Sequence, residues 1–172
     1  TVRASDGTNT TDQAITVSVQ DVNDNSPSIT SANTASIDEN DNTTVITVAA
    51  TDADATSSVT YSVTGGVDQG LFSINNTSGA LTFDTAPDAE NPSDDDNNNE
   101  YIVEVTATDG TNTDVQTITV TVNDVNDVDP IITASQSFNI DENSADGTSV
   151  GTVVATDGDV TATTFQTWTI TS

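Results

Sequence analysis

An internal repeat with a period of 103 residues is the feature that most restricts how this chain can fold. The motif Asp-Val-Asn-Asp begins at Asp21 and again at Asp124, and Asp-Glu-Asn begins at Asp38 and again at Asp141. A period of this length corresponds to about one small β-sandwich domain. The repeat therefore predicts similar domains in tandem.

The period divides the 172 residues into three parts. Residues 1–26 correspond to the C-terminal strands of a first repeat and its linker, residues 27–129 to a complete repeat and its linker, and residues 130–172 to the N-terminal strands of a third repeat. The two partial repeats together lack the equivalents of residues 66–103. We therefore expect the chain to start and stop inside domains.

The complete repeat carries the two-residue alternation that is typical of half-buried strands. Apolar side chains alternate over residues 46–50, 103–107 and 118–122, and residues 72–83 have the pattern of a hairpin around Gly79. Thr, which favours strands, accounts for 34 residues, while abundant Asp, Asn and Ser favour turns. These patterns predict an all-β fold, with about seven short strands in each antiparallel sandwich.

The charge balance restricts the partners of the chain. There are 28 acidic residues and one basic residue, Arg3, so the formal net charge is −27. Such a surface cannot release counterions from a polyanion, which excludes nucleic acid and anionic membrane surfaces as partners. No apolar run approaches the roughly 20 residues needed to span a bilayer, so we expect no membrane insertion. Cations are the expected partners.

An enzyme is the least favoured class. The sequence contains neither His nor Cys, which removes the usual nucleophile pairs and the usual zinc, haem and iron-sulfur sites. Carboxylate pairs such as Asp52 and Asp54 could act as the acid and base of a glycosidase. They recur with the period, however, whereas catalytic groups need occur only once.

The acidic residues gather beside the Pro-terminated linkers. Two carboxylates about 4 Å apart repel by ~1 kcal/mol in water and ~4 kcal/mol at an intermediate dielectric. Ca²⁺ takes about six to eight oxygen ligands, and Asp-x-Asn-Asp supplies such oxygens within four residues. We therefore expect Ca²⁺ at the linkers, where it would also stabilise a thin core that has no disulfide. The alternative, a solvated acidic surface, is expected for scattered residues such as Asp12, Asp68 and Asp114.

Over the whole chain the ordered motifs resemble those of the cadherin repeat, particularly its bacterial tandem forms. The matching motifs are the early glutamate Glu39, Asp-x-Glu at Asp88 and Glu90, the linker motifs at residues 21–25 and 124–127, Asp-x-Asp at Asp52 and Asp54 and at Asp157 and Asp159, and the single aspartate Asp109. The resemblance implies seven-stranded Greek-key sandwiches, similar to immunoglobulin domains. It also implies Ca²⁺ at each junction, held by two neighbouring repeats and their linker.

The resemblance further implies a ligand set for each junction. At the second junction the expected ligands are Glu39, Asp88, Glu90, Asp124, Asp127, Asp159 and the Val125 carbonyl, and a lower ion would use Asn126, the Val128 carbonyl, Asp157 and Asp159. That lower ion is expected to be weak or absent, because its later aspartate falls beyond residue 172. At the first junction the expected ligands are Asn23, the Asn25 carbonyl, Asp52, Asp54 and Asp109, with Asp21 and Asp24 having fewer partners.

Some residues depart from the family pattern. Val128 replaces the second Asn of the linker motif, which is tolerable if only its carbonyl binds, and Ala89 replaces an Arg. The segment 91–99, with three consecutive aspartates, is longer than the pattern leads us to expect. We interpret it as a solvated loop, with an extra ion as the alternative.

A mechanical function follows, since an ion held by two domains fixes their relative orientation. The sequence predicts a calcium-rigidified extracellular or cell-surface segment of a large bacterial protein, acting in adhesion or as a stiff spacer. Its expected partners are Ca²⁺ and neighbouring repeats of the same array.

Two other functions remain open. Identical chains could join by strand complementation into an extracellular filament or surface layer. Polysaccharide binding is less favoured, because the single tryptophan, Trp168, aligns with Tyr61, a predicted core position.

Overall fold

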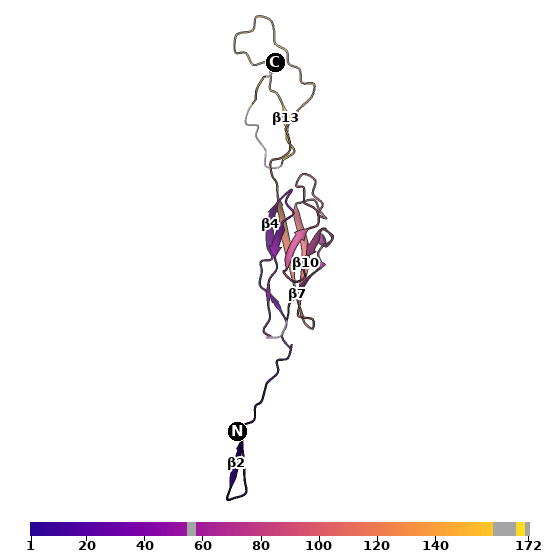
Figure 1. Cartoon of the computed structure of the whole chain (residues 1–172). Coiled ribbons are helices and arrows are strands. Elements are labelled where there is room, and N and C mark those ends of the chain that lie inside the picture. Colours follow the sequence, from indigo (N-terminus) through magenta and orange to yellow (C-terminus); the bar gives the residue numbers. More distant parts are fainter. Residues whose placement is uncertain (55–57, 160–167, 171–172) are drawn as a thin grey trace.

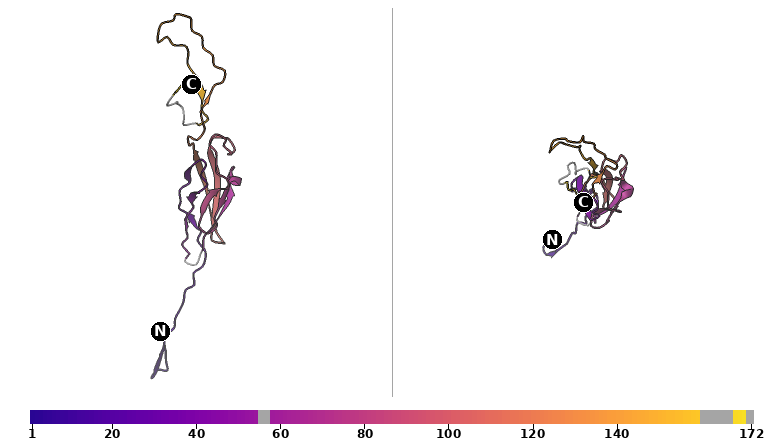
Figure 2. Two further views of the ribbon diagram at one scale, coloured as in Figure 1. Left: turned by 45° about the horizontal axis from the view of Figure 1, so that its top comes forward. Right: turned by 90° about the horizontal axis from the view of Figure 1, so that it is seen from above.

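The computed structural model describes residues 1–54, 58–159 and 168–170, and nearly all of its regular structure is β. A sandwich lies in the middle of the chain, between an N-terminal hairpin at one end and the C-terminal segment at the other (Figure 1). Figure 2 shows the same succession from two further directions. The described residues include one short helix, η1 (Gln69–Leu71), and none of their helices is long and apolar enough to cross a membrane.

The first sheet of the sandwich has four strands in the order β4-β11-β10-β7. These are β4 (Thr34–Asp38), β11 (Thr113–Asn123), β10 (Glu100–Thr108) and β7 (Thr60–Gly65). β4 runs parallel to β11, whereas the other neighbours are antiparallel. Every second side chain of β10 is buried, because successive side chains of a strand point to opposite faces.

The second sheet has three strands in the order β5-β9-β8. These are β5 (Thr44–Thr47), β9 (Ala80–Phe83) and β8 (Phe72–Ile74). β3 (Ser28–Ile29) and β6 (Ala50–Thr51) form a separate two-stranded sheet, in which β3 contacts β11 of the first sheet. Between residues 27 and 129 the described chain thus forms nine strands, several of them very short. The all-β sandwich is confirmed, whereas the predicted count of seven is not.

The predicted hairpin around Gly79 is confirmed, since β8 and β9 pair antiparallel with Phe72 opposite Phe83. Gly79 has φ +72°, and a Cβ atom there would overlap the carbonyl oxygen of Val48. Only glycine meets both conditions. The carbonyl of Gly79 in turn accepts a hydrogen bond of 2.8 Å from the Val48 N–H, which joins the turn to the chain after β5.

One apolar core lies between the sheets. An aromatic cluster forms its centre, with ring centroids of Phe72 and Phe83 4.3 Å apart and those of Phe83 and Tyr101 5.0 Å apart. Buried aliphatic side chains from both sheets surround it: Ile37, Val48, Leu81, Val103, Val105, Ile118, Val120 and Val122. The alternation over residues 103–107 and 118–122 therefore predicts the core-facing side chains correctly.

The described residues at the two ends of the chain form much less regular structure. β1 (Val2–Ser5) pairs with β2 (Thr10–Gln13), and β12 (Ile131–Ile132) pairs with β13 (Ala155–Thr156). Trp168 is 51% exposed, so its predicted core position is wrong for this chain. The equivalent Tyr61 is covered because its strand pairs with β10, and no counterpart of β10 occurs among the described residues after 130.

Two of the scattered aspartates are not solvated surface groups. Asp68 is 5% exposed, and its carboxylate accepts hydrogen bonds from the backbone N–H groups of Asp95 and Ile102, at 2.9 and 2.7 Å. Asp114 accepts one from Ile29 N–H at 2.7 Å. The prediction is wrong here because carboxylates can satisfy amides that no strand partner reaches.

Candidate metal centres at the two junctions

Glu39 is the centre of the second junction. It follows β4 and keeps that strand in register, since its N–H donates to the Asn123 carbonyl at 2.9 Å. Its side chain is 4% exposed and accepts hydrogen bonds from the backbone N–H groups of Ala89 and Val125, both at 2.7 Å. One carboxylate thus joins the end of β4, the loop after β9 and the linker after β11.

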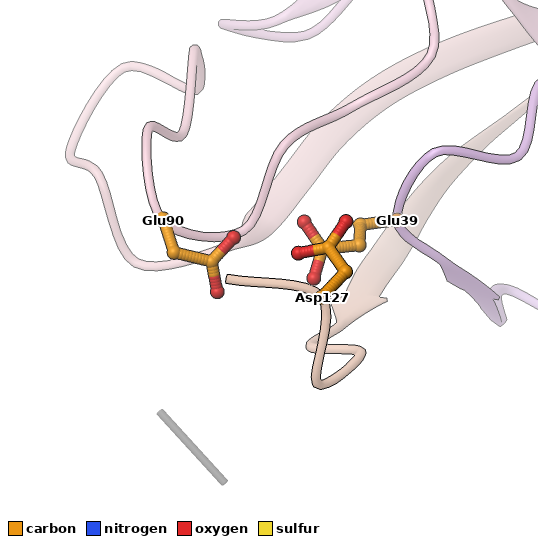
Figure 3. Close-up of side chains that lie close together, drawn as sticks. All are labelled: Glu39, Glu90 and Asp127. Atoms are coloured by element: carbon orange, nitrogen blue, oxygen red, sulfur yellow. The ribbon is translucent and has the colours of Figure 1, made fainter. Parts of the chain in front are cut away.

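Glu39 and four further carboxylates form two overlapping groups. Glu39, Glu90 and Asp127 each offer an oxygen, and these oxygens lie within 4.8 Å of one another. Glu90, Asp124 and Asp159 form a second group with the same spacing. Figure 3 shows the Glu39 and Asp127 carboxylates side by side, with Glu90 facing them from its own loop. The two groups share Glu90.

The electrostatics of this cluster favour a bound cation. The adjacent Asp124 carboxylate, burial and the charge of Glu39 raise the pKa of Glu90 to about 7. Glu90 Oε1 and Asp159 Oδ2 are buried and accept no hydrogen bond from the described residues. Buried charges need a partner, and an all-oxygen donor set suits Ca²⁺. The sole basic residue, Arg3, is bound to Asp12 in the N-terminal hairpin.

Asp159 connects the third part of the chain to the linker. It is 5% exposed, and its Oδ1 accepts hydrogen bonds from the N–H groups of Asp127 and Val128, at 3.2 and 3.1 Å. Its own N–H donates to Asp157 Oδ1 at 3.3 Å. The Asp-x-Asp motif therefore holds the linker from the far side.

Not every residue expected at the second junction belongs to the close carboxylate groups. Asp88 is exposed and accepts a hydrogen bond from Asn91 N–H at 3.0 Å, and Asn126 is exposed. Val125 and Val128 face the cluster through N–H groups that bind Glu39 and Asp159. The assignment of these four residues as ligands stays a prediction.

At the first junction, as at the second, an aspartate from the repeat that follows the linker binds the linker. Asp54 is 6% exposed and accepts hydrogen bonds from Asn25 N–H at 2.8 Å and Asn25 Nδ2 at 2.7 Å. Asp54 N–H donates to Asp52 Oδ1 at 2.9 Å, and Asp52 Oδ2 is buried and accepts no hydrogen bond from the described residues. Asp24 Oδ1 accepts from Asn25 Nδ2 at 3.0 Å, and Asp21 and Asp24 are both exposed.

Asn112 gathers the remaining groups of the first junction. Its Nδ2 donates to the Asn25 carbonyl at 2.9 Å, to Asp109 Oδ2 at 3.2 Å and to Asn23 Oδ1 at 3.3 Å. Hydrogen bonds, chiefly from the Asn112 N–H, lower the pKa of Asp109. The structure thus brings together three predicted ligands, Asn23, Asn25 and Asp109.

Sequence reasoning missed two amides that organise the junctions. One is Asn112, and the other is Asn40, whose Nδ2 donates to Asp127 Oδ2 at 2.7 Å. The repeat carried the signal, because Asn9 precedes Asn112 by one period and Asn143 follows Asn40 by one period.

Comparisons with known proteins agree with this architecture. A family model described as the cadherin domain matches residues 33–123. The human protein named Cadherin EGF LAG seven-pass G-type receptor 2 is 37% identical over 154 residues, which is 87% of this chain and 5% of the receptor. Protocadherin-like wing polarity protein stan of Drosophila melanogaster is 33% identical over 86% of this chain and 4% of its own length. The chain therefore spans a small fraction of these relatives.

Solved structures show the same fold. Extracellular cadherin domains 3–6 of protocadherin gamma B2 superpose with a TM-score of 0.71 and 25% identity, over 87% of this chain and 39% of that one. The EC1-4 structure of Drosophila N-cadherin gives a TM-score of 0.62 and 30% identity, over 78% of this chain and 34% of that one. On the matched domain, the fold and these similarities together, this chain belongs to the cadherin family.

Proposed function

We propose that this chain is a calcium-rigidified segment of the extracellular region of a longer surface or secreted protein, where it acts in adhesion or as a stiff spacer. One observation carries the proposal. Asp159, from beyond the linker, is buried against the linker amides and groups with Glu90 and Asp124 from the complete repeat and its linker. An ion bound by these oxygens is shared by two repeats.

The residues of the chain have distinct tasks in this proposal. Glu39, Glu90, Asp124, Asp127 and Asp159 hold the ion at the second junction, with Asp88, Asn126, Asp157 and the Val125 and Val128 carbonyls as further oxygens. Bound Ca²⁺ supplies the positive charge that offsets their mutual repulsion. At the first junction Asp21, Asn23, Asp24, Asn25, Asp52, Asp54 and Asp109 have the same task.

Rigidity then depends on calcium concentration through linkage. A ligand that binds the docked arrangement better than the undocked one stabilises it by RT ln(1 + [L]/Kd). Extracellular calcium modules work at about 10⁻⁴ to 10⁻³ M. An array of such repeats is stiff in extracellular fluid and flexible in a chelator.

Small-angle X-ray scattering tests the proposal on the whole chain. With about 10 mM Ca²⁺, roughly ten times the upper end of the Kd range for such modules, the maximum dimension should be large and sharply defined, and EGTA should shorten or broaden it. Glu39→Gln combined with Asp159→Asn should resemble the EGTA state even in Ca²⁺. Glu142→Gln combined with Asp146→Asn, at two exposed residues and with the same charge change, should behave as the unmodified chain. Identical scattering in Ca²⁺ and EGTA contradicts the proposal.

A second candidate, assembly into a filament, has one observation in its favour. Ile15, Val17 and Val19 are 56%, 81% and 92% exposed and form no strand, although they are one period before Ile118, Val120 and Val122, which are buried in β11. An exposed apolar segment of this kind can pair as a strand with the sheet edge of another chain. Light scattering after size exclusion tests it, since a mass that stays monomeric as concentration rises contradicts assembly. Polysaccharide binding and a bacterial origin stay predictions.

A further inference from the structure

The loop between β9 and β10 contains a buried acidic side chain that the junctions do not use. Asp94 is 5% exposed, and its Oδ1 is buried and accepts no hydrogen bond from the described residues. The prediction of a simple solvated loop over residues 91–99 is therefore wrong for Asp94. A buried carboxylate oxygen without a partner is costly, and a cation offsets that cost.

Two residues with oxygen-bearing side chains, Asp96 and Asn98, follow Asp94 at alternate positions of the same loop. Asp94 Oδ2 accepts a hydrogen bond from Asn98 N–H at 2.8 Å, which curls the chain around the carboxylate. Asp96 lies close enough that desolvation and the Asp94 and Asp95 carboxylates raise its pKa. Asn98 Nδ2 donates to Asp96 Oδ2 at 2.9 Å. Contacts within the loop thus connect Asn98 to both Asp94 and Asp96.

The backbone holds this arrangement in place. Asp68 accepts hydrogen bonds from the N–H groups of Asp95 and Ile102, which lie on opposite sides of the turn. Asn99 has φ +64° and donates from Nδ2 to the Ala89 carbonyl at 2.9 Å. The loop is therefore fixed to the sandwich at several points.

We propose that residues 94–100 bind a Ca²⁺ ion separate from the junction ions. Asp94, Asp96 and Asn98 are the side-chain ligands, the Glu100 carbonyl is a fourth, and water completes the shell. To bind the ion, the Asn98 amide rotates so that its Oδ1, which accepts a hydrogen bond of 2.6 Å from Glu100 N–H, takes the place of Nδ2 beside Asp96. The order matches the alternate-position calcium loop, which takes ligands at positions 1, 3, 5 and 7 and a sharp turn at position 6. Asn99 has the positive φ at that sixth position.

The site lacks the bidentate acid that ends the strongest loops of this kind. Position 12 would be Val105, which is fully buried in β10. We therefore expect a Kd in the range of extracellular modules, about 10⁻⁴ to 10⁻³ M. The ion would lie within one repeat and would stabilise the loop that presents Glu90, through the Asn99 to Ala89 hydrogen bond.

Counting bound ions tests the proposal on the whole chain. By equilibrium dialysis at saturating Ca²⁺, Asp96→Ala should bind one ion per chain fewer than the unmodified protein. Asp95→Ala is the matched control, because it removes the same charge from an exposed, non-alternate position of the same loop. Equal stoichiometry for Asp96→Ala and the unmodified chain overturns the proposal.

Amide NMR separates this site from the junctions. In Glu39→Gln, whose second junction is impaired, the backbone N–H signals of residues 95–100 should still shift as Ca²⁺ is added. In Asp96→Ala those signals should stay in place, while signals of residues 125–128 still move. A loop that does not respond in Glu39→Gln overturns the loop site and leaves the junction proposal standing.

Discussion

The two junctions share one half of their architecture and differ in the other. We call the repeat that precedes a linker its near side and the repeat that follows it the far side. On the far side of each linker, a buried aspartate accepts two hydrogen bonds: Asp54 from Asn25, and Asp159 from Asp127 and Val128. On the near side, the second junction crowds acidic side chains around Glu39, whereas Asp21 and Asp24 of the first junction are exposed.

The difference separates two tasks that a junction must perform. The linker docks onto the following repeat through hydrogen bonds between carboxylates and N–H groups. Carboxylate crowding arises only where the preceding repeat contributes its own acids, as Glu39 and Glu90 do. Bound calcium would therefore offset carboxylate repulsion chiefly on the near side.

Glu39→Gln should have the largest effect, confined to the second junction. The buried carboxylate accepts two amide N–H groups at 2.7 Å, and the NH₂ of a glutamine would face one of them. We expect a loss of about 3 kcal/mol in the free energy of unfolding of the sandwich, with loss of Ca²⁺ binding at that junction. Chemical unfolding with and without Ca²⁺ measures both.

A matched control exists within the repeat. Glu142 occupies the same Asp-Glu-Asn motif one period later and is exposed, so Glu142→Gln should leave stability and calcium binding unchanged. If the two variants behave alike, the special role of Glu39 is refuted.

Asp159→Asn and Asp54→Asn should each affect one junction, in different ways. Both linker amides bind Asp159 Oδ1, so an asparagine there can keep the contact and lose only its charge. Asp54 uses both oxygens toward Asn25, so its asparagine also loses a hydrogen bond. We expect at least about tenfold weaker calcium binding in each case, worth roughly 1.4 kcal/mol. Residual dipolar couplings in EGTA should show added disorder only for Asp54→Asn.

The sequence predicts the fold and the location of the junctions better than it predicts how single acids behave. Alternation identifies the buried faces of β10 and β11, because side-chain direction in a strand follows from position alone. Asp68 and Asp94 were missed because their burial depends on loop amides that lack strand partners, and that depends on the tertiary path. Asp88 and Asn126 show the same limit, since motif membership does not fix side-chain exposure.

Lowering the pH from 8 to 6 should weaken calcium binding at the second junction more than at the first. Glu90 has a pKa of about 7 and takes up a proton over this range, which competes with the ion. The lowered pKa of Asp109 keeps that group ionised. Without calcium, lowering the pH should have the opposite effect and stabilise the fold. A raised carboxyl pKa means that the folded state gains protons, so stability should increase as pH falls through 7.

Calcium titrations at the two pH values, followed by the N–H signals of residues 125–128 and 23–25, measure this contrast. Glu90→Gln should abolish the pH dependence at the second junction between pH 6 and 8. A pH response of equal size at both junctions would assign the effect to the overall acidity of the chain instead.

Val128→Asn should have the smallest effect and tests whether the far-side contact alone sets docking without calcium. Asn25 binds Asp54 through both N–H and Nδ2, whereas Val128 offers Asp159 only its N–H. A new amide could donate to Asp159 Oδ2, which is buried and accepts no hydrogen bond from the described residues, for about 1 kcal/mol. NMR relaxation in EGTA should then show residues 157–159 becoming as ordered as residues 52–54, and Asn25→Val should produce the opposite change. If neither substitution alters the order, docking is governed by the near-side acids, and the division of tasks between the two halves of a junction does not hold.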